Sequence, residues 1–222
     1  MITIAIDGPC GSGKSTVSEG IAKKLGILYL NTGAIYRAIA LYMLRNNINS
    51  NNINSITDAM DKINIEIKYL NNEQHTFLNG EDVSKQLYSM EVSDASSVFA
   101  QFKEVRDKIL HIQRNLAKVQ SIVMEGRDIT SHVLPDAKFK FYIDASPEIR
   151  AQRRINDEKI IGKPQLCFEK VLADIFERDE RDKNRTISPL ILVEDAIYIN
   201  TDNRNVEDVV NDIYKLIKSK KD

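Results

Sequence analysis

The sequence is poor in several features that mark particular classes of protein. It has only two cysteines, Cys10 and Cys167, with no CxxC pair and no framework of spacings, which is typical of a reducing compartment and not of a disulfide-stapled domain. No segment approaches the apolar length that spans a membrane, and the opening MITIAID lacks the basic region and long apolar stretch of a secretory signal. We therefore expect a cytoplasmic protein with no membrane partner.

An excess of either charge sign is also missing. The 222 residues carry 31 Lys and Arg against 32 Asp and Glu, a formal net charge of -1. Proteins that bind nucleic acid by bulk charge need a strongly basic surface, so we expect no nucleic-acid partner and expect any basic site to be local. The hydrophobic content of 42% is that of an ordinary globular protein, and the length favours one main domain with an insertion.

What is present is an alternation of short apolar strands and amphipathic helices, which predicts an α/β fold with a parallel sheet covered by helices on both faces. A polar, Asn-rich connector covers 46–55, and alternating apolar and polar residues predict a small antiparallel hairpin at about 63–80. Thr32 is the expected N-cap of the second helix, and Ser146-Pro147-Glu148 begins a later one. We expect strands at 2–7, 27–30, 121–126, 138–145 and 197–200, and helices at 15–25, 33–47, 91–100, 102–118 and 206–218.

A glycine-rich segment, GPCGSGKS, satisfies the pattern GxxxxGK[ST] between the first predicted strand and the first predicted helix. Its glycines let the backbone curl so that N–H groups point at phosphate oxygens, Lys14 bridges the outer phosphates, and the Ser15 hydroxyl reaches a magnesium ion. The alternative is that this segment is an ordinary Gly-rich strand-to-helix turn. Cys10 lies near a helix N-terminus, where a thiolate is favoured, so it is either a redox-sensitive residue or a plain loop residue.

A phosphate loop alone leaves several functions open. Regulatory GTPases need a guanine-reading NKxD, which the sequence does not contain, and motor or transport ATPases are generally larger. Small kinases and non-catalytic nucleotide binders remain. The choice between them depends on which other residues reach the loop.

The segment ERDERDKNR at 177–185 packs eight charged side chains into nine positions. Arg178, Arg181 and Arg185, spaced three and four apart, share one helix face beside the buried one. Guanidiniums on one face repel one another, so this face favours a bound anion, although a plain solvated helix face is the alternative. The buried face is predicted from apolar residues at helical spacing: Phe168, Val171, Leu172, Ile175 and Phe176.

Two shorter segments lie where strands end. NTGAIYR follows the second strand and so opens at the sheet edge that carries the phosphate loop. Thr32 can donate at a helix N-terminus and Arg37 can clamp an anion, with a surface arginine as the alternative. EGRD ends a later strand and places Arg127 and Asp128 at that same edge.

The order and separations of the sequence motifs resemble those of bacterial cytidylate kinases, a family of nucleoside monophosphate kinases. The motifs that carry this resemblance are the phosphate loop, NTGAIYR, EVSDAS, EGRDI, LPDA and RDERDKNR. The resemblance covers about residues 2 to 200. It implies transfer of the γ-phosphoryl group of ATP to CMP or dCMP with Mg2+ as cofactor, and we expect a monomer. It also implies a P-loop three-layer fold as a single domain over 1–222, with a nucleoside-monophosphate-binding insertion at about 46–90 and a mobile arginine-rich lid at about 153–186.

The resemblance carries roles over residue by residue. The positions that hold ATP are Gly8, Pro9, Cys10, Gly11, Ser12, Gly13, Lys14, Ser15 and Thr16, with Arg153 near the donor nucleotide. The catalytic positions are Lys14, Arg127, Arg178 and Arg181. The acceptor-binding positions are Thr32, Tyr36, Arg37, Ser97, Arg106, Arg127, Asp128, Arg178, Asp182 and Arg185. The metal position is Ser15.

The resemblance also implies how cytosine is chosen over uracil. Cytosine offers an amino donor and a ring acceptor, so Asp128 can accept from the first while Ser97 or Arg106 donates to the second. Uracil reverses both groups. Asp182 matches the position that binds the sugar hydroxyls.

Alternatives remain at the level of function and of single residues. A kinase of the same fold with another acceptor, such as UMP or a small metabolite, fits the pattern, and a catalytically silent nucleotide-binding module fits the loop alone. Arg153 can instead belong to a salt-bridged helix surface. Glu125 stands where several relatives carry Asp, which leaves its role towards magnesium open.

Overall fold

The computed structural model describes residues 1–71, 73–160 and 167–219. The chain divides into two compact units: unit 1 is Met1–Tyr29 with Gln120–Asp222, and unit 2 is Leu30–Val119. Unit 1 therefore contains the phosphate-loop segment and the arginine-rich segment, while unit 2 is one continuous stretch of chain.

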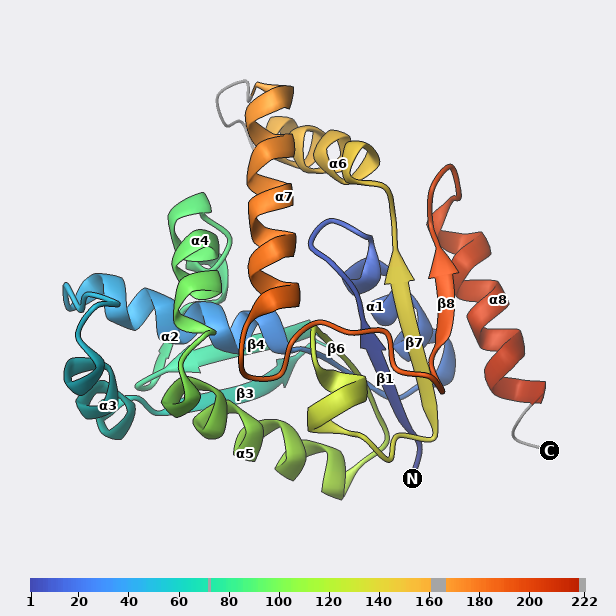
Figure 1. The fold of residues 1–222 in the computed structure, drawn as a ribbon. Helices are drawn as coiled ribbons and strands as arrows, with labels where there is room; N and C mark the ends of the chain where they lie inside the picture. The colour runs from blue at the N-terminus through green and yellow to red at the C-terminus, as the bar shows by residue number, and fades with distance from the viewer. Residues whose placement is uncertain (72, 161–166, 220–222) are drawn as a thin grey trace. The chain divides into compact units, whose positions relative to one another are not determined.

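A five-stranded sheet forms the frame of unit 1, and its strands are β1 (Thr3–Asp7), β2 (Leu28–Asn31), β6 (Ile122–Gly126), β7 (Phe139–Asp144) and β8 (Ile197–Asn200). Their order is β2-β6-β1-β7-β8 (Figure 1), and β1 pairs in parallel with both β6 and β7. β7 also pairs in parallel with β8. Because β1 lies between two strands that come much later in the chain, its carboxyl end is the switch point at which open α/β sheets bind ligands.

The middle strands of this sheet are buried because helices flank them. Ile6 in β1 and Phe141 in β7 have no exposed surface. Two helices, α1 (Lys14–Leu25) and α8 (Val206–Ser219), pack against each other and contribute to the same apolar cluster (Figure 1). The prediction of an α/β fold around a mostly parallel sheet is confirmed.

Two further helices, α6 (Pro147–Ile160) and α7 (Phe168–Asn184), follow β7 and pack against each other. Val171 and Ile175 on α7 and Ile155 on α6 are buried together in a small apolar cluster. This cluster accounts for the helical spacing of apolar residues in the sequence.

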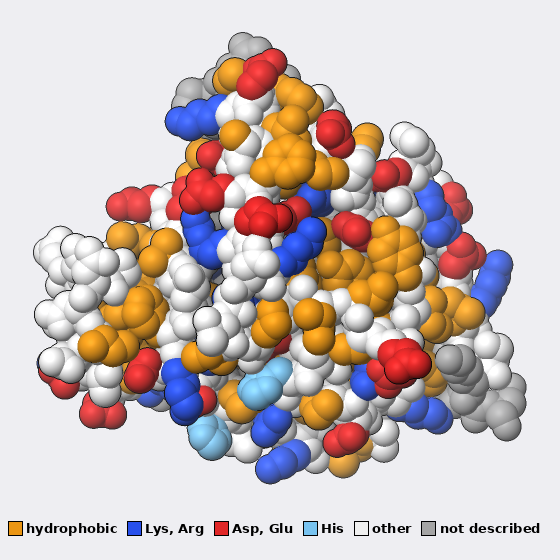
Figure 2. Space-filling view, in the orientation of Figure 1, with side chains coloured by type: hydrophobic (Ala, Val, Ile, Leu, Met, Phe, Trp, Pro, Cys, Tyr) orange, Lys and Arg blue, Asp and Glu red, His pale blue; other side chains and the backbone are white. Residues whose placement is uncertain are grey.

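The end of α7 differs from the sequence prediction. Phe176 is predicted on the buried face but is 49% exposed, and Figure 2 shows apolar side chains at the surface over the upper part of α7. The buried face continues instead through Asp179 and Asp182, each 6% exposed, which lie one and two turns beyond Ile175. Carboxylates at buried positions need partners, and the site described below supplies them.

Unit 2 combines helices with a small antiparallel sheet. Its elements are α2 (Thr32–Arg45), α3 (Ile53–Lys62), β3 (Ile65–Leu70), β4 (Glu73–Leu78), β5 (Glu81–Asp82), the short 3-10 helix η1 (Ser84–Gln86), α4 (Met90–Phe99) and α5 (Lys103–Val119). β3 pairs with β4, and β4 with β5, in antiparallel register. α2 packs against α4, α5 and β4, and its Ile35 and Ile39 are fully buried. The predicted hairpin and antiparallel β insertion are thus confirmed.

The start of α2 differs from the prediction by one residue. Asn31, not Thr32, is the N-cap, because the Asn31 side chain accepts a hydrogen bond from the Ala34 backbone N–H at 3.2 Å. Thr32 is the first helical residue and is buried. Asn and Thr are both good N-caps, so residue type alone does not decide between these two neighbours.

The Asn-rich connector is also more ordered than its composition suggests. The predicted connector at 46–55 contains the start of α3, which the sequence analysis missed. The Asn52 side chain accepts from the Ser55 backbone N–H at 3.1 Å and caps this helix. Ile56 and Met60, four residues apart, are buried and give α3 its apolar face.

The other predicted strands and helices begin and end within two residues of the expected positions. The predicted lid contains residues 161–166, which lie outside the described residues, so a mobile lid stays a prediction. The single kinase domain over 1–222 and the nucleoside-monophosphate-binding role of the insertion at about 46–90 also stay predictions. Among the helices of the described ranges, none combines the length and apolar character that a bilayer crossing requires.

The contact between α1 and α8 depends on a glycine. A Cβ at Gly20 would lie 2.8 Å from Val210 Cγ2, and a β-branched valine cannot easily turn aside. We expect the effect of Gly20→Ala on the free energy of unfolding to be more favourable in a Val210→Ala background than in the unchanged protein. The difference between the two effects, the coupling energy, should be about 1–3 kcal/mol. Urea unfolding of the two single variants, the double variant and the parent measures this coupling. Strictly additive changes in the free energy of unfolding would contradict it.

Candidate active site

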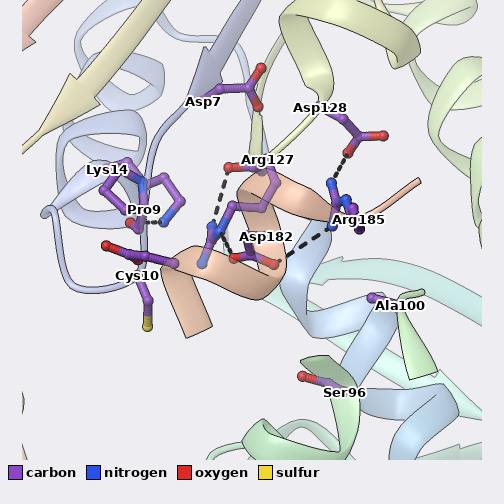
Figure 3. Close-up of polar contacts among 12 residues, drawn as sticks. Asp7, Pro9, Cys10, Lys14, Ser96, Ala100, Arg127, Asp128, Asp182 and Arg185 are labelled. Atoms are coloured by element: carbon purple, nitrogen blue, oxygen red, sulfur yellow. Dashed lines mark hydrogen bonds and ion pairs between the residues drawn. The ribbon is translucent and has the colours of Figure 1, made fainter. Parts of the chain in front are cut away.

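The phosphate loop begins with a turn that only glycine fits. Gly8 has a φ of 154°, and a Cβ there would lie 1.9 Å from the Ile143 carbonyl oxygen in β7. Lys14 folds back over the loop, where its Nζ donates to the Pro9 carbonyl oxygen at 2.9 Å (Figure 3). The remaining predicted ATP positions of this segment lie in the same turn or the first turn of α1: Cys10, Gly11, Ser12, Gly13, Ser15 and Thr16.

A hydroxyl and a carboxylate meet beside the loop. Ser15 Oγ donates to Glu125 Oε1 at 2.8 Å, and Lys14 Nζ lies 4.0 Å from Glu125 Oε2. Glu125, at the end of β6, is 3% exposed. Such oxygens suit a magnesium ion whose other ligands are phosphate oxygens and water, so Ser15 and Glu125 fit a metal that arrives with ATP. Across the described ranges, no cluster of three His, Cys, Asp or Glu could hold a metal without such help.

A row of alternating charges runs from the end of β6 to the end of α7 (Figure 3). Arg127 Nε donates to Asp182 Oδ2 at 2.9 Å. On the other side of Asp182, Oδ1 lies 3.7 Å from Arg185 Nη1, and Arg185 Nη2 lies 3.9 Å from Asp128 Oδ1. We call these four residues the charge row. Its side chains are at most 17% exposed, so water screens these attractions weakly.

Burial and neighbouring charge shift the pKa values of this region. Burial lowers the pKa of Arg127, but the negative charges of Asp182, Cys10 and Glu125 together raise that pKa well above its usual value. Burial raises the pKa of Asp182, whereas Arg127, Arg178 and Arg185 bring it below the usual value. Burial, with Arg127 adding to it, lowers the pKa of Lys14 to about 8. At neutral pH Arg127 and Lys14 are therefore predominantly cationic and Asp182 anionic.

An arginine that the sequence analysis missed ties α7 to the phosphate loop. Arg150 is 2% exposed and pairs with Asp179 through both carboxylate oxygens, at 3.0 and 2.6 Å. The same guanidinium donates to the carbonyl oxygens of Cys10 at 3.1 Å and Ala145 at 2.9 Å. The sequence held a signal for the buried acid of this pair, because the apolar stripe of α7 extended by one turn falls on Asp179.

Arg153 also reaches the loop, through a threonine at the end of β8. Its guanidinium donates to Thr201 Oγ1 at 3.0 Å and to the Thr201 carbonyl oxygen at 2.8 Å. Thr201 Oγ1 lies 2.9 Å from the Ser12 carbonyl oxygen and donates there. Arg153 therefore lies by the loop and bonds to Thr201, a neutral residue; its place near the donor nucleotide stays a prediction.

The remaining arginines of the predicted anion-binding face are compensated by acids. Arg181 pairs with Glu177, one turn earlier in α7. Arg178 adds positive charge near Cys10 and Asp182. The repulsion that the sequence predicts between the arginines is therefore offset by carboxylates of the same segment.

The other predicted acceptor residues lie in unit 2. The Arg37 guanidinium stacks 4.9 Å from the centre of the Tyr88 ring, a contact the sequence analysis missed. The Arg106 guanidinium lies 5.6 Å from the Tyr36 ring, and its Nη1 donates to the Ala100 carbonyl oxygen at 2.9 Å. Two further residues of this set, Thr32 and Ser97, are buried. Cation–π contacts of this kind hold a guanidinium over the face of an aromatic ring.

Comparison with known proteins shows the family that shares this sequence. The family model described as cytidylate kinase matches residues 4–219. The chain belongs to the cytidylate kinase family. A cytidylate kinase of Caldicellulosiruptor saccharolyticus is 42% identical over 215 residues, covering 97% of this chain and 95% of the relative. A cytidylate kinase of Clostridium acetobutylicum is 40% identical over 219 residues, covering 99% of each.

The fold of this cytidylate kinase family member also has a counterpart among solved structures. A crystal structure of a protein from Eubacterium ventriosum matches with a TM-score of 0.54 at 15% identity, covering 99% of both chains. At that identity the likeness bears on the fold alone. The family resemblance predicted from the motifs is confirmed, whereas the roles assigned to single residues stay predictions.

Cys10 gives a direct chemical readout of the charge at this site. Burial raises the pKa of its thiol, but Arg178, Arg127 and Lys14 together lower it to about 6. We expect the rate of Cys10 alkylation by iodoacetamide to rise with pH through about 6 and to level off above 7, because the thiolate is the nucleophile. Mass spectrometry of the modified peptides measures this rate, with the exposed Cys167 as an internal reference. A rate that rises only above pH 8 would contradict the expectation.

Proposed function

We propose that this chain transfers the γ-phosphoryl group of ATP to CMP and dCMP, giving CDP and dCDP. Membership of the cytidylate kinase family supports the activity. The observation that carries the proposal for this site is the gathering of Lys14, Arg127 and Arg178 around Cys10 of the phosphate loop, with Arg185 beside Asp182. Phosphoryl transfer needs little covalent help from a protein, so positioning and charge neutralisation by such cations supply most of the acceleration.

On the donor side, the loop from Gly8 to Thr16 binds the phosphates of ATP. Its backbone N–H groups face the phosphate oxygens, and Lys14 leaves the Pro9 carbonyl oxygen to contact the phosphoryl group being transferred. Ser15 and Glu125 hold a magnesium ion together with the ATP phosphates. When bound, the metal neutralises negative charge on the phosphates.

On the acceptor side, Arg127 binds the phosphate of CMP and Asp128 accepts a hydrogen bond from the cytosine amino group. Both residues already lie in the charge row, where Asp182 and Arg185 compensate them. An arriving phosphate replaces a carboxylate as the partner of a guanidinium, so binding exchanges one charge-assisted contact for another. The acceptor-binding roles of Arg37 and Arg106, in unit 2, stay expectations from the family resemblance.

Steady-state assays with a panel of acceptors test the proposed reaction. ATP turnover coupled to nucleoside diphosphate formation is measured with CMP, dCMP, UMP, AMP and shikimate in turn. We expect CMP and dCMP to be turned over efficiently and the other three poorly. Slow ATP hydrolysis that no acceptor stimulates would identify a nucleotide-binding module instead of a kinase.

Arg181 tests the proposed role of the α7 arginines. If its guanidinium meets the phosphoryl group only in the transition state, Arg181→Ala lowers kcat by about a hundredfold with little change in KM. Lys183→Ala, an exposed position of the same helix, removes an equal charge and should leave kcat near its parent value. Stopped-flow or coupled kinase assays give both constants. A weaker KM with unchanged kcat would reject the assignment.

Asp128 tests the proposed reading of the base. Asp128→Asn keeps the side-chain volume but presents an amide, which can turn its donor towards uracil's carbonyl. An unmatched buried polar group costs roughly 1–3 kcal/mol, so the preference for CMP over UMP should fall by tens to hundreds of fold. The ratio of kcat/KM values for the two nucleotides measures this preference. An unchanged ratio would show that another residue reads cytosine.

A further inference from the structure

Asp7, the last residue of β1, is a buried acid for which the proposed reaction has no use. It has no exposed surface. Its Oδ1 accepts from the Ile129 backbone N–H at 2.9 Å, and its Oδ2 accepts from the Thr130 backbone N–H at 2.7 Å and the Thr130 hydroxyl at 2.6 Å. All three donors come from the segment that follows β6. The carboxylate therefore binds a neighbouring segment and not the phosphate loop that begins one residue later.

The three donors open a short π-helix, η2 (Ile129–Val133), whose first amides have no partner within their own helix. The residue before it, Asp128, accepts from the backbone N–H groups of His132 at 2.9 Å and Val133 at 3.0 Å. The carbonyl end of Asp128 is thus fixed by η2, and the amide that follows it is fixed by Asp7. The backbone of Asp128 has little freedom left.

Burying the Asp7 carboxylate is unfavourable, so its three hydrogen bonds to Ile129 and Thr130 must compensate for the loss of water. Burial raises the pKa of Asp7 to about 6, against the hydrogen bonds from Thr130, which lower it, and the charge of Asp128 raises it as well. An acid in such surroundings is retained in its ionised form only because it meets three donors. In Figure 3 its side chain points away from Lys14 and Pro9.

We infer that Asp7 is a positioning residue for acceptor recognition: by holding the amides of Ile129 and Thr130, it fixes the direction in which Arg127 and Asp128 present their side chains. The inference rests on the proposed function of those two residues. Asp7 itself contacts neither nucleotide. It links the end of β1, where ATP binds, to the segment that reads the acceptor.

Asp7→Asn tests the inference with almost no change of volume. An amide has one acceptor atom where the carboxylate has two, so its NH2 group must face a donor from Ile129 or Thr130 whichever way it turns. We expect KM for CMP to rise about ten- to hundredfold and the preference for CMP over UMP to fall, the range set by one unmatched buried hydrogen bond. KM for ATP should stay within about twofold of the parent value.

Thr130 supplies a matched pair of variants that spares the core if Asp7→Asn folds poorly. Thr130→Val removes the hydroxyl donor and keeps the shape, whereas Thr130→Ser keeps the donor and loses a methyl group. We expect the valine variant to shift KM for CMP and the CMP over UMP preference in the direction of Asp7→Asn, and the serine variant to remain near the parent. The melting temperature of each variant is measured alongside.

The outcomes separate positioning from simple stability. The inference is supported if Asp7→Asn and Thr130→Val change only the affinity for CMP and the CMP over UMP preference, while Thr130→Ser keeps both near the parent values. Unchanged CMP kinetics in both Asp7→Asn and Thr130→Val overturn it, and so does an equal loss towards ATP and CMP that follows the melting temperature. If Asp128→Asn leaves the CMP over UMP preference intact while Asp7→Asn changes it, the proposed reading of cytosine by Asp128 fails. If Asp7→Asn leaves that preference intact while Asp128→Asn changes it, the inference about Asp7 fails.

Discussion

Opposite charges held away from water organise the carboxyl edge of the unit 1 sheet. Arg127, Asp182, Arg185 and Asp128 alternate in sign and are largely buried, so each charge depends on the next for compensation. Removing one partner from such a row leaves an uncompensated buried charge, which costs far more than an exposed ion pair contributes.

The phosphate loop is held by hydrogen bonds to its backbone carbonyl oxygens. Arg150 joins the Cys10 carbonyl oxygen to Asp179 on α7, and Thr201 joins the Ser12 carbonyl oxygen to Arg153. These bonds use the loop's carbonyl oxygens and leave its N–H groups for a ligand. A loop supported in this way needs little rearrangement when ATP binds, which is the preorganisation that electrostatic catalysis requires.

Local pattern was enough for most of the fold and for part of the site. Apolar periodicity and the glycine-rich motif located the strands, the helices and the phosphate loop, because these depend on neighbours in sequence. The whole of α3 was missed since composition obscured the spacing of Ile56 and Met60. The partners of Asp7 and Asp179 could not be read from any local pattern, because they lie on other elements and are set by tertiary packing. Phe176 was misplaced for the related reason that a paired acid took the buried position.

The position of β1 at the centre of its sheet has a consequence for biosynthesis. Thr3 pairs with Ile122, and Ile4 with Phe139, so β1 finds its hydrogen-bonding neighbours only after β6 and β7 have been synthesised. Until then the nascent apolar segment has two open edges, which are templates for non-native pairing. The sheet of unit 1 therefore cannot form around β1 until β6 and β7 follow it, and any shielding of the nascent β1 segment must last until then.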